Sequence, residues 1–171
     1  MADKYLSYDR TTGRIKEKEA TVESSGSADA GKIVALGSDG KLSSTVLPAG
    51  SEESAISLQA YETLSAGDCV NIFDDGGTPK VRKADASSNK PAHGYVLDSA
   101  SAGGTVTVYF DGHNTQLSDL TPGKYYFLSA TTPGGVSDTP PSETGYLAQR
   151  LGVAINANTI DVEIEDPIEL A

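Results

Sequence analysis

Residues 103–129 carry the clearest alternation of apolar and polar positions in the chain. Val106, Val108 and Phe110 alternate with threonine and tyrosine, which is the period of a half-buried β-strand. The polar residues that follow end in Thr-Pro-Gly-Lys at 121–124, in which proline fixes φ and glycine is free to take a positive φ. Tyr125 then begins a second strand. This stretch therefore predicts a strand, a turn and a strand.

Similar signals continue to residue 171 at the short spacing typical of a β-sandwich or β-barrel. We expect strands at Ala55–Tyr61, Cys69–Phe73, Lys80–Ala84, Gly94–Leu97, Thr105–Phe110, Tyr125–Leu128, Ala148–Ile155 and Thr159–Ile164. The last has one apolar and one acidic face, so it is either an edge strand protected by charge or a strand with one side in water. We predict a mainly β fold: an extended N-terminal arm, then a compact antiparallel β-sandwich or β-barrel domain.

Residues 1–50 form the predicted arm, and residues 51–54 the linker to the domain at 55–171. A glycine, a basic residue and an aliphatic residue recur at 13–15, 31–33 and 40–42, each typical of a turn leading into a short strand. The longest such strands are expected at Lys32–Leu36 and Leu42–Leu47. The arm has too few large apolar residues to close its own core. We expect these residues to bind a partner or a sister subunit: Tyr5, Leu6, Tyr8, Ile15, Ile33, Val34, Leu36, Leu42, Val46 and Leu47.

Composition and charge support the division of the chain into an arm and a domain. The 171 residues suit one ordinary domain plus an arm, and eighteen glycines and eight prolines fit a turn-rich β protein. The net charge of −11 lies wholly in residues 51–171, because residues 1–50 hold seven basic and seven acidic residues. So acidic a domain repels phosphate backbones, which argues against nucleic acid as a ligand. Neither a signal sequence nor a long apolar run is present, so we expect synthesis in the cytoplasm and no membrane partner.

Several residues that can carry chemistry have a simpler structural interpretation. Residues 26–32 match the GxxxxGK pattern of a phosphate-binding loop, but Ile33 follows where serine or threonine is required and no helix is predicted. His93 and His113 are interpreted as loop residues, and Cys69 as a small buried hydrophobe. We therefore expect no enzyme and no cofactor.

Acidic and aromatic residues leave two further alternatives. Asp74 and Asp75 lack the ligand spacing of a Ca²⁺ loop and suit a hairpin turn. The acidic side of the last strand is expected to be solvated rather than catalytic. The eight tyrosines offer an apolar ring with a polar edge, as sugar-binding grooves do, although most are expected in the core or in interfaces. These tyrosines are Tyr5, Tyr8, Tyr61, Tyr95, Tyr109, Tyr125, Tyr126 and Tyr146.

Two blocks of the sequence resemble the head-decoration and head-fibre proteins of tailed bacteriophages, and related modules on some tail fibres. The first block is SSGSADAGKIVALGSDGKLSSTVLP at 24–48. The second is spread over residues 64–170 and includes HGYVLDSASAGGTVTVYFDGHNTQLSDLTPGKYYFLSATTPGG and QRLGVAINANTIDVEIEDPIEL. Together they cover about three quarters of the chain. These are turn-and-strand patterns, and they imply a kind of fold and a location rather than a catalytic site.

The resemblance implies a structural virion protein on the capsid surface, anchored to the major capsid protein through its N-terminal arm. It also implies a homotrimer, which would use one sheet face as a subunit interface. Because the last predicted strand comes close to Ala171, we expect a position on the head. The alternatives are a short fibre or adaptor at the collar or tail, and a carbohydrate-binding module that contacts host-surface glycans.

Overall fold

The computed structural model describes residues 4–38, 40–47 and 54–171, which form two compact units, residues 1–52 and 53–171. Strands dominate both of them, and the described residues contain short 3₁₀ turns but no α-helix. The mainly β class predicted from the sequence is confirmed. Most of the predicted linker, residues 51–53, lies outside the described residues.

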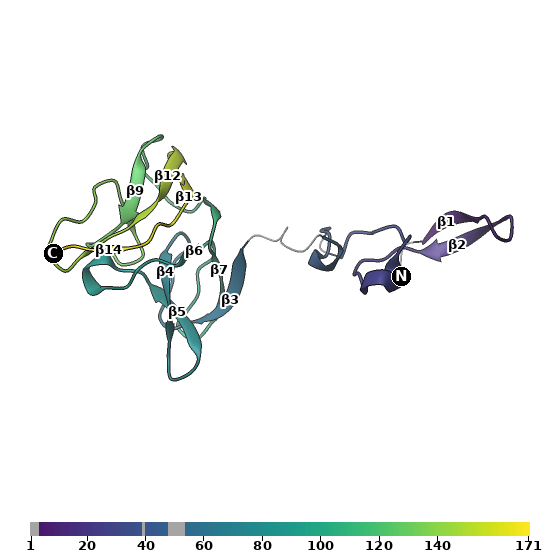
Figure 1. Ribbon diagram of the computed structural model, residues 1–171, viewed down its shortest axis with the longest axis horizontal. Coiled ribbons are helices and arrows are strands. Elements are labelled where there is room, and N and C mark those ends of the chain that lie inside the picture. Colours follow the sequence, from purple (N-terminus) through teal and green to yellow (C-terminus); the bar gives the residue numbers. More distant parts are fainter. Residues whose placement is uncertain (1–3, 39, 48–53) are drawn as a thin grey trace. The chain divides into compact units, whose positions relative to one another are not determined.

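The N-terminal unit begins with a β-hairpin, which corrects the prediction of an extended arm. Strand β1 (Lys4–Asp9) pairs antiparallel with β2 (Arg14–Glu19), and the amide of Gly13 donates to the carbonyl of Asp9 at 2.9 Å to close the turn. Figure 1 shows the hairpin at the N-terminal end of the chain. The prediction that a strand begins directly after Gly13 is confirmed. The partner strand β1 was not predicted.

The two strands predicted later in this unit are wrong. In Lys32–Leu36 the only pairing is a parallel bridge between Thr21 and Val34, so one β-bridge forms in place of a strand. Leu42–Leu47 contains the 3₁₀ turn η2 (Ser44–Val46) instead. There the Ser43 hydroxyl accepts from the amide of Thr45 at 3.3 Å, and the Ser43 carbonyl accepts from Val46 at 3.1 Å. Such local bonds compete with pairing between strands.

The C-terminal unit contains a closed five-stranded barrel, with the strand order β3-β5-β4-β6-β7. Its strands are β3 (Ala55–Ala60), β4 (Cys69–Asp74), β5 (Pro79–Lys83), β6 (Gly94–Val96) and β7 (Thr105–Tyr109). All neighbours are antiparallel except β3 and β5, which run parallel. Fully buried valines fill the interior, because alternate residues of each strand point inward. They include Val70, Val81, Val96 and Val108.

A second sheet, in the order β10-β9-β12-β13-β8, packs beside this barrel (Figure 1). Its strands are β8 (Gly112–Asn114), β9 (Tyr125–Leu128), β10 (Val136–Ser137), β12 (Arg150–Asn156) and β13 (Thr159–Val162). A short pair, β11 (Leu147–Ala148) with β14 (Ile168–Glu169), and the 3₁₀ turn η3 (Ala86–Ser88) complete the unit. Of the two alternatives predicted from the sequence, a β-sandwich and a β-barrel, the structure has a β-barrel, to which an antiparallel sheet is added.

All eight strands predicted in this unit are present, with ends that differ by a few residues. The predicted Ala148–Ile155 strand is divided between β11 and β12, and β8 forms within a segment expected to be a loop. Strand β13 lies between β12 and β8, so it is not an edge strand. Its Ile160 is buried while Asp161 is exposed, which matches the alternative of a strand with one side in water.

The predicted turn at 121–124 is also confirmed. The amide of Lys124 donates to the carbonyl of Thr121 at 3.2 Å, and Gly123 has a φ of +81°. A second glycine, Gly152, lies at a bulge of β12, where there is no space for a Cβ atom. Its φ is +149°, and a Cβ there would lie 2.0 Å from the carbonyl oxygen of Asp161 on β13.

We predict that Gly152→Ala destabilises the C-terminal unit more than Gly123→Ala does. Both substitutions force alanine to take a positive φ, at a cost of about 1–2 kcal/mol. A Cβ at residue 123 meets no atom within 4 Å, whereas at residue 152 it overlaps the backbone of β13. Overpacking of this kind costs about 1–3 kcal/mol more. Urea unfolding of the full chain measures both losses, and equal losses would contradict the role given to the β12 bulge.

Candidate functional site

The outer part of the hairpin carries an exposed apolar patch on one face. Tyr8 and Ile15 are paired across the strands, and Leu6 lies two residues before Tyr8 on the same face. Their exposed fractions are 73% for Leu6, 64% for Tyr8 and 68% for Ile15. We call these three residues the hairpin patch. Large apolar residues gathered on a surface mark interaction sites more often than residues scattered singly.

The opposite face of the hairpin is basic, a feature that the sequence interpretation missed. Arg14, Lys16 and Lys18 alternate along β2 and so point to the same side. The Lys16 ammonium lies 2.5 Å from the Asp9 carboxylate. This hydrogen bond, together with one from the backbone of Thr11, lowers the pKa of Asp9 from the ordinary 3.8 to about 2. The alternation of basic residues at 14, 16 and 18 is the sequence signal that predicts such a face.

The ten residues predicted to bind a partner are not all brought together. Tyr5 lies on the basic face, where its hydroxyl donates to the carbonyl of Gly31 at 3.4 Å. Val34 and Val46 line one shallow hollow of about 220 Å³. The other members outside the hairpin are all at least 40% exposed, namely Ile33, Leu36, Leu42 and Leu47. Within 4–38 and 40–47, no side chain whose exposure the structure describes is buried.

The loop that matches the phosphate-binding pattern has its lysine engaged internally. Gly26–Asp29 forms the 3₁₀ turn η1, and the Lys32 ammonium lies 2.6 Å from the Asp29 carboxylate. That hydrogen bond lowers the pKa of Asp29, and the Ser25 amide donates to the same carboxylate. The lysine of the pattern is thus paired with an aspartate of the same loop.

The two histidines lie in different settings. His93 accepts a hydrogen bond at Nδ1 from the amide of Ile72 at 3.0 Å, and partial burial lowers its pKa. His113 lies on β8, with Nε2 3.5 Å from the Asp161 carboxylate, and both side chains are exposed. In the described part of the chain, no group of three or more histidine, cysteine or acidic side chains is arranged to hold a metal ion.

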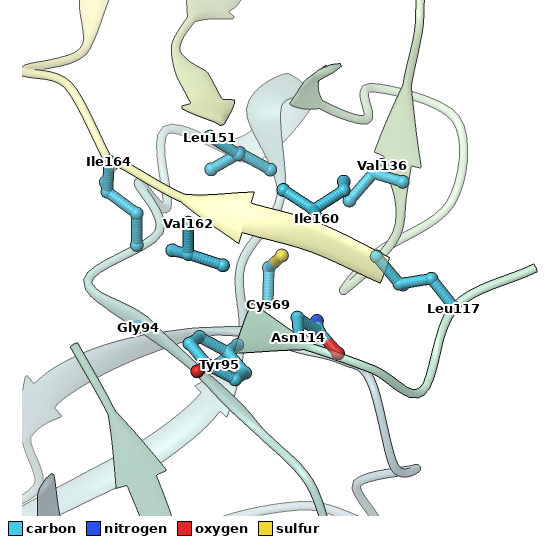
Figure 2. Close-up of a pocket in the computed structure, with 10 residues that line it drawn as sticks. All are labelled: Cys69, Gly94, Tyr95, Asn114, Leu117, Val136, Leu151, Ile160, Val162 and Ile164. Carbon is cyan, nitrogen blue, oxygen red and sulfur yellow. The ribbon is translucent and has the colours of Figure 1, made fainter. Parts of the chain in front are cut away.

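Figure 2 shows a small apolar cavity between the barrel and the second sheet, with a volume of about 10 Å³. Cys69 and Tyr95 border it from the barrel, and Leu151 and Ile160 from the sheet. Cys69 is 5% exposed, so its prediction as a buried hydrophobe is confirmed. Burial, and secondarily the charge of Asp68, raises the pKa of its thiol to about 12. Neither histidine and no carboxylate lines this cavity.

The exposed tyrosines of the C-terminal unit do not form a single groove. Tyr61 follows β3 of the barrel and packs edge-on against Phe73, with ring centroids 5.2 Å apart. Tyr125 begins β9 in the second sheet, where the Arg150 guanidinium lies 4.9 Å from its ring centroid. Tyr95 and Tyr126 are buried. Tyr146 is partly exposed and borders a separate polar hollow.

The sequence matches no family model and no curated protein sequence. None of the helical turns in the described residues is long and apolar enough to span a membrane.

We predict that the Asp9 carboxylate titrates near pH 2 in the full chain, measured by NMR. Because folding lowers this pKa, the stabilisation that Asp9 gives the hairpin is present above about pH 4 and is lost as the pH falls through about 2. Lys16→Ala removes the largest cause and shifts the midpoint towards 3.8. Lys18→Ala, on the same face, serves as the control and leaves it near 2. A wild-type midpoint near 3.8 would contradict the Asp9–Lys16 contact.

Proposed function

We propose that this chain is a structural attachment protein whose N-terminal unit binds a protein surface and whose C-terminal unit is presented to solvent. The observation that carries the proposal is the uneven distribution of apolar exposure. Among the described residues, nine of the fourteen exposed large apolar side chains belong to the N-terminal unit, which holds less than a third of the chain. A unit that buries so little of its own apolar surface gains stability when a partner covers it.

The hairpin supports the same proposal. A two-stranded hairpin is at best marginally stable alone in water. The ion pair of Lys4 with Glu17 is solvent-exposed, and such pairs contribute little to stability. The pair of Lys16 with Asp9 is partly exposed and provides no apolar contact. A protein surface that covers the hairpin patch would add the missing apolar contact. The basic face offers a second, charge-selective contact to an acidic region of the same partner.

The resemblance to bacteriophage head-decoration and head-fibre proteins suggests which surface this is. We propose the major capsid protein as the partner, the capsid surface of the virion as the location, and a homotrimer as the assembled form. The strongly acidic C-terminal unit suits a role on the outside of a particle, since like charge keeps neighbouring copies soluble at high local density. The proposal assigns no catalytic step to the chain.

The runner-up proposal is a short fibre or adaptor at the collar or tail, which uses the same attachment chemistry. Gold labelling with an antibody against residues 54–171 distinguishes the two on purified phage particles viewed by electron microscopy. We expect gold distributed over the head. Gold confined to the tail would replace the decoration proposal by the fibre proposal, and particles without gold would refute both.

We predict that Ile15→Asp weakens attachment to particles by at least about tenfold, because the new carboxylate would be buried without a partner. Ile168→Asp on β14 is the matched control. Ile15 is 68% exposed and Ile168 is 66% exposed, so neither substitution disturbs a core. Co-sedimentation of each full-length variant with particles that lack the protein measures the binding. Equal binding of the two variants would exclude the hairpin patch from the attachment surface.

A further inference from the structure

The segment between β9 and β11 encloses an open cleft of about 230 Å³ on the C-terminal unit. Apart from the two residues of β10, the eighteen residues 129–146 form no strand or helix. Long irregular segments in compact domains are usually functional or disordered. Five hydroxyl side chains, a carboxylate, a tyrosine and two prolines line this one, together with Ala130. They are Ser129, Thr131, Ser137, Thr139, Ser142, Glu143, Tyr146, Pro140 and Pro141.

Hydrogen bonds within the segment hold the cleft in shape. The Ser129 hydroxyl accepts from the amides of Thr131 at 3.2 Å and Thr132 at 3.0 Å. On the other side, the Ser137 hydroxyl donates to the carbonyl of Thr139 at 2.8 Å and accepts from the Thr139 amide at 3.1 Å. The adjacent prolines, Pro140 and Pro141, restrict the backbone further. Such a cleft is largely preformed, which lowers the entropic cost of binding a ligand.

The backbone at Tyr146 is held by hydrogen bonds with Leu170, the residue directly after β14. The amide of Gly145 donates to the carbonyl of Leu170 at 2.7 Å, and the amide of Leu170 donates to the carbonyl of Tyr146 at 2.9 Å. A hydrogen bond with the Glu143 carboxylate engages the Tyr146 hydroxyl and raises the pKa of this tyrosine. Tyr146 therefore lines the cleft beside Glu143.

The side chains that line the cleft indicate which class of ligand it can bind. Hydroxyl groups both donate and accept, and those of Ser129 and Ser137 keep only part of this capacity for a ligand because they also bond within the segment. The exposed Ser142 adds a further hydroxyl group, so the cleft suits a ligand that both donates and accepts. An aromatic face beside polar groups suits the C–H face of a sugar ring. Glu143 is the one lining residue that is charged at neutral pH, and the whole chain carries −11, so anionic ligands are disfavoured. The volume lies below the roughly 300–1,000 Å³ of pockets for drug-sized ligands, which indicates a small ligand unit.

We infer that this cleft binds a single neutral sugar residue, free or as one unit of a longer glycan. The inference concerns the C-terminal unit alone and does not depend on how the N-terminal unit attaches. It assigns the glycan contact to the residues around Tyr146 rather than to the more exposed Tyr61 and Tyr125. A ligand of about a dozen heavy atoms at ordinary ligand efficiency binds with a dissociation constant of millimolar order.

The test is NMR titration of the isotope-labelled full chain with methyl β-glucoside and with N-acetylglucosamine, up to tens of millimolar. Galacturonate serves as the anionic probe. We expect saturable amide shifts confined to residues 129–146 with at least one neutral sugar, and much weaker binding of galacturonate. The absence of saturable shifts with both neutral sugars, shifts centred elsewhere, or equal binding of galacturonate would each overturn the inference.

Variants then test the residues. Tyr146→Ala should weaken binding at least about tenfold, whereas Tyr61→Ala, which truncates an exposed tyrosine of the barrel, should leave it unchanged. Ser142→Trp places a bulky side chain on an exposed residue of the cleft and should abolish binding without touching the core. If Tyr146→Ala fails to fold, Ser142→Trp decides the matter. Unchanged binding by the Ser142→Trp variant would overturn the assignment to this cleft.

Discussion

Everything in the C-terminal unit depends on the apolar layer that the barrel and the second sheet share. Cys69 and Tyr95 close this layer from the barrel side, and Leu151 and Ile160 close it from the sheet side, with a void of only about 10 Å³ left between them. Interiors packed so closely transmit strain and tolerate little change in volume. A five-stranded barrel alone encloses few side chains, and the added sheet supplies a second buried layer. The strands of that sheet can then hold an irregular segment of eighteen residues at their margin.

The N-terminal unit, in contrast, has hydrogen-bonded strands and turns but no apolar core among its described residues. Its strands pair, its turns are closed by serine, threonine and aspartate side chains, and yet none of its residues with described exposure is buried. Hydrogen bonds of this kind favour one backbone conformation over others, but each adds little net free energy of folding in water. The apolar side chains Leu6, Tyr8 and Ile15 and the basic face of the hairpin are therefore left at its surface, where we propose that another protein binds. One chain thus combines a unit that is stabilised by its own core with a unit whose apolar side chains face outward.

Sequence reasoning succeeded where alternation and turn chemistry agree and failed where they conflict. The run from Thr105 to Phe110 and the Pro122-Gly123 turn were predictable because both the period of two and the φ requirement of glycine are local. The strand expected at Leu42–Leu47 did not form, because the hydroxyls of Ser43 and Thr45 satisfy nearby backbone groups instead. The short strands β8, β10 and β14 were not predicted, because two or three residues are too few to show a periodicity. The cleft at Tyr146 was equally hidden, because hydrogen bonds inside the irregular segment 129–146 shape it and no periodic pattern marks them.

The pairing of residues 145–148 with residues 168–170 sets an order of events during synthesis. Strand β14 follows every other strand of the unit along the chain, so the barrel and the second sheet can be complete while β11 still lacks its partner. Because synthesis runs from the N-terminus, the backbone at Tyr146 lacks these hydrogen bonds until residues 168–170 have been made. A chain cut before residue 168 would therefore lose the hydrogen bonds that hold residues 145–148. Residues 168–170 are therefore the last part of the C-terminal unit that the cleft needs.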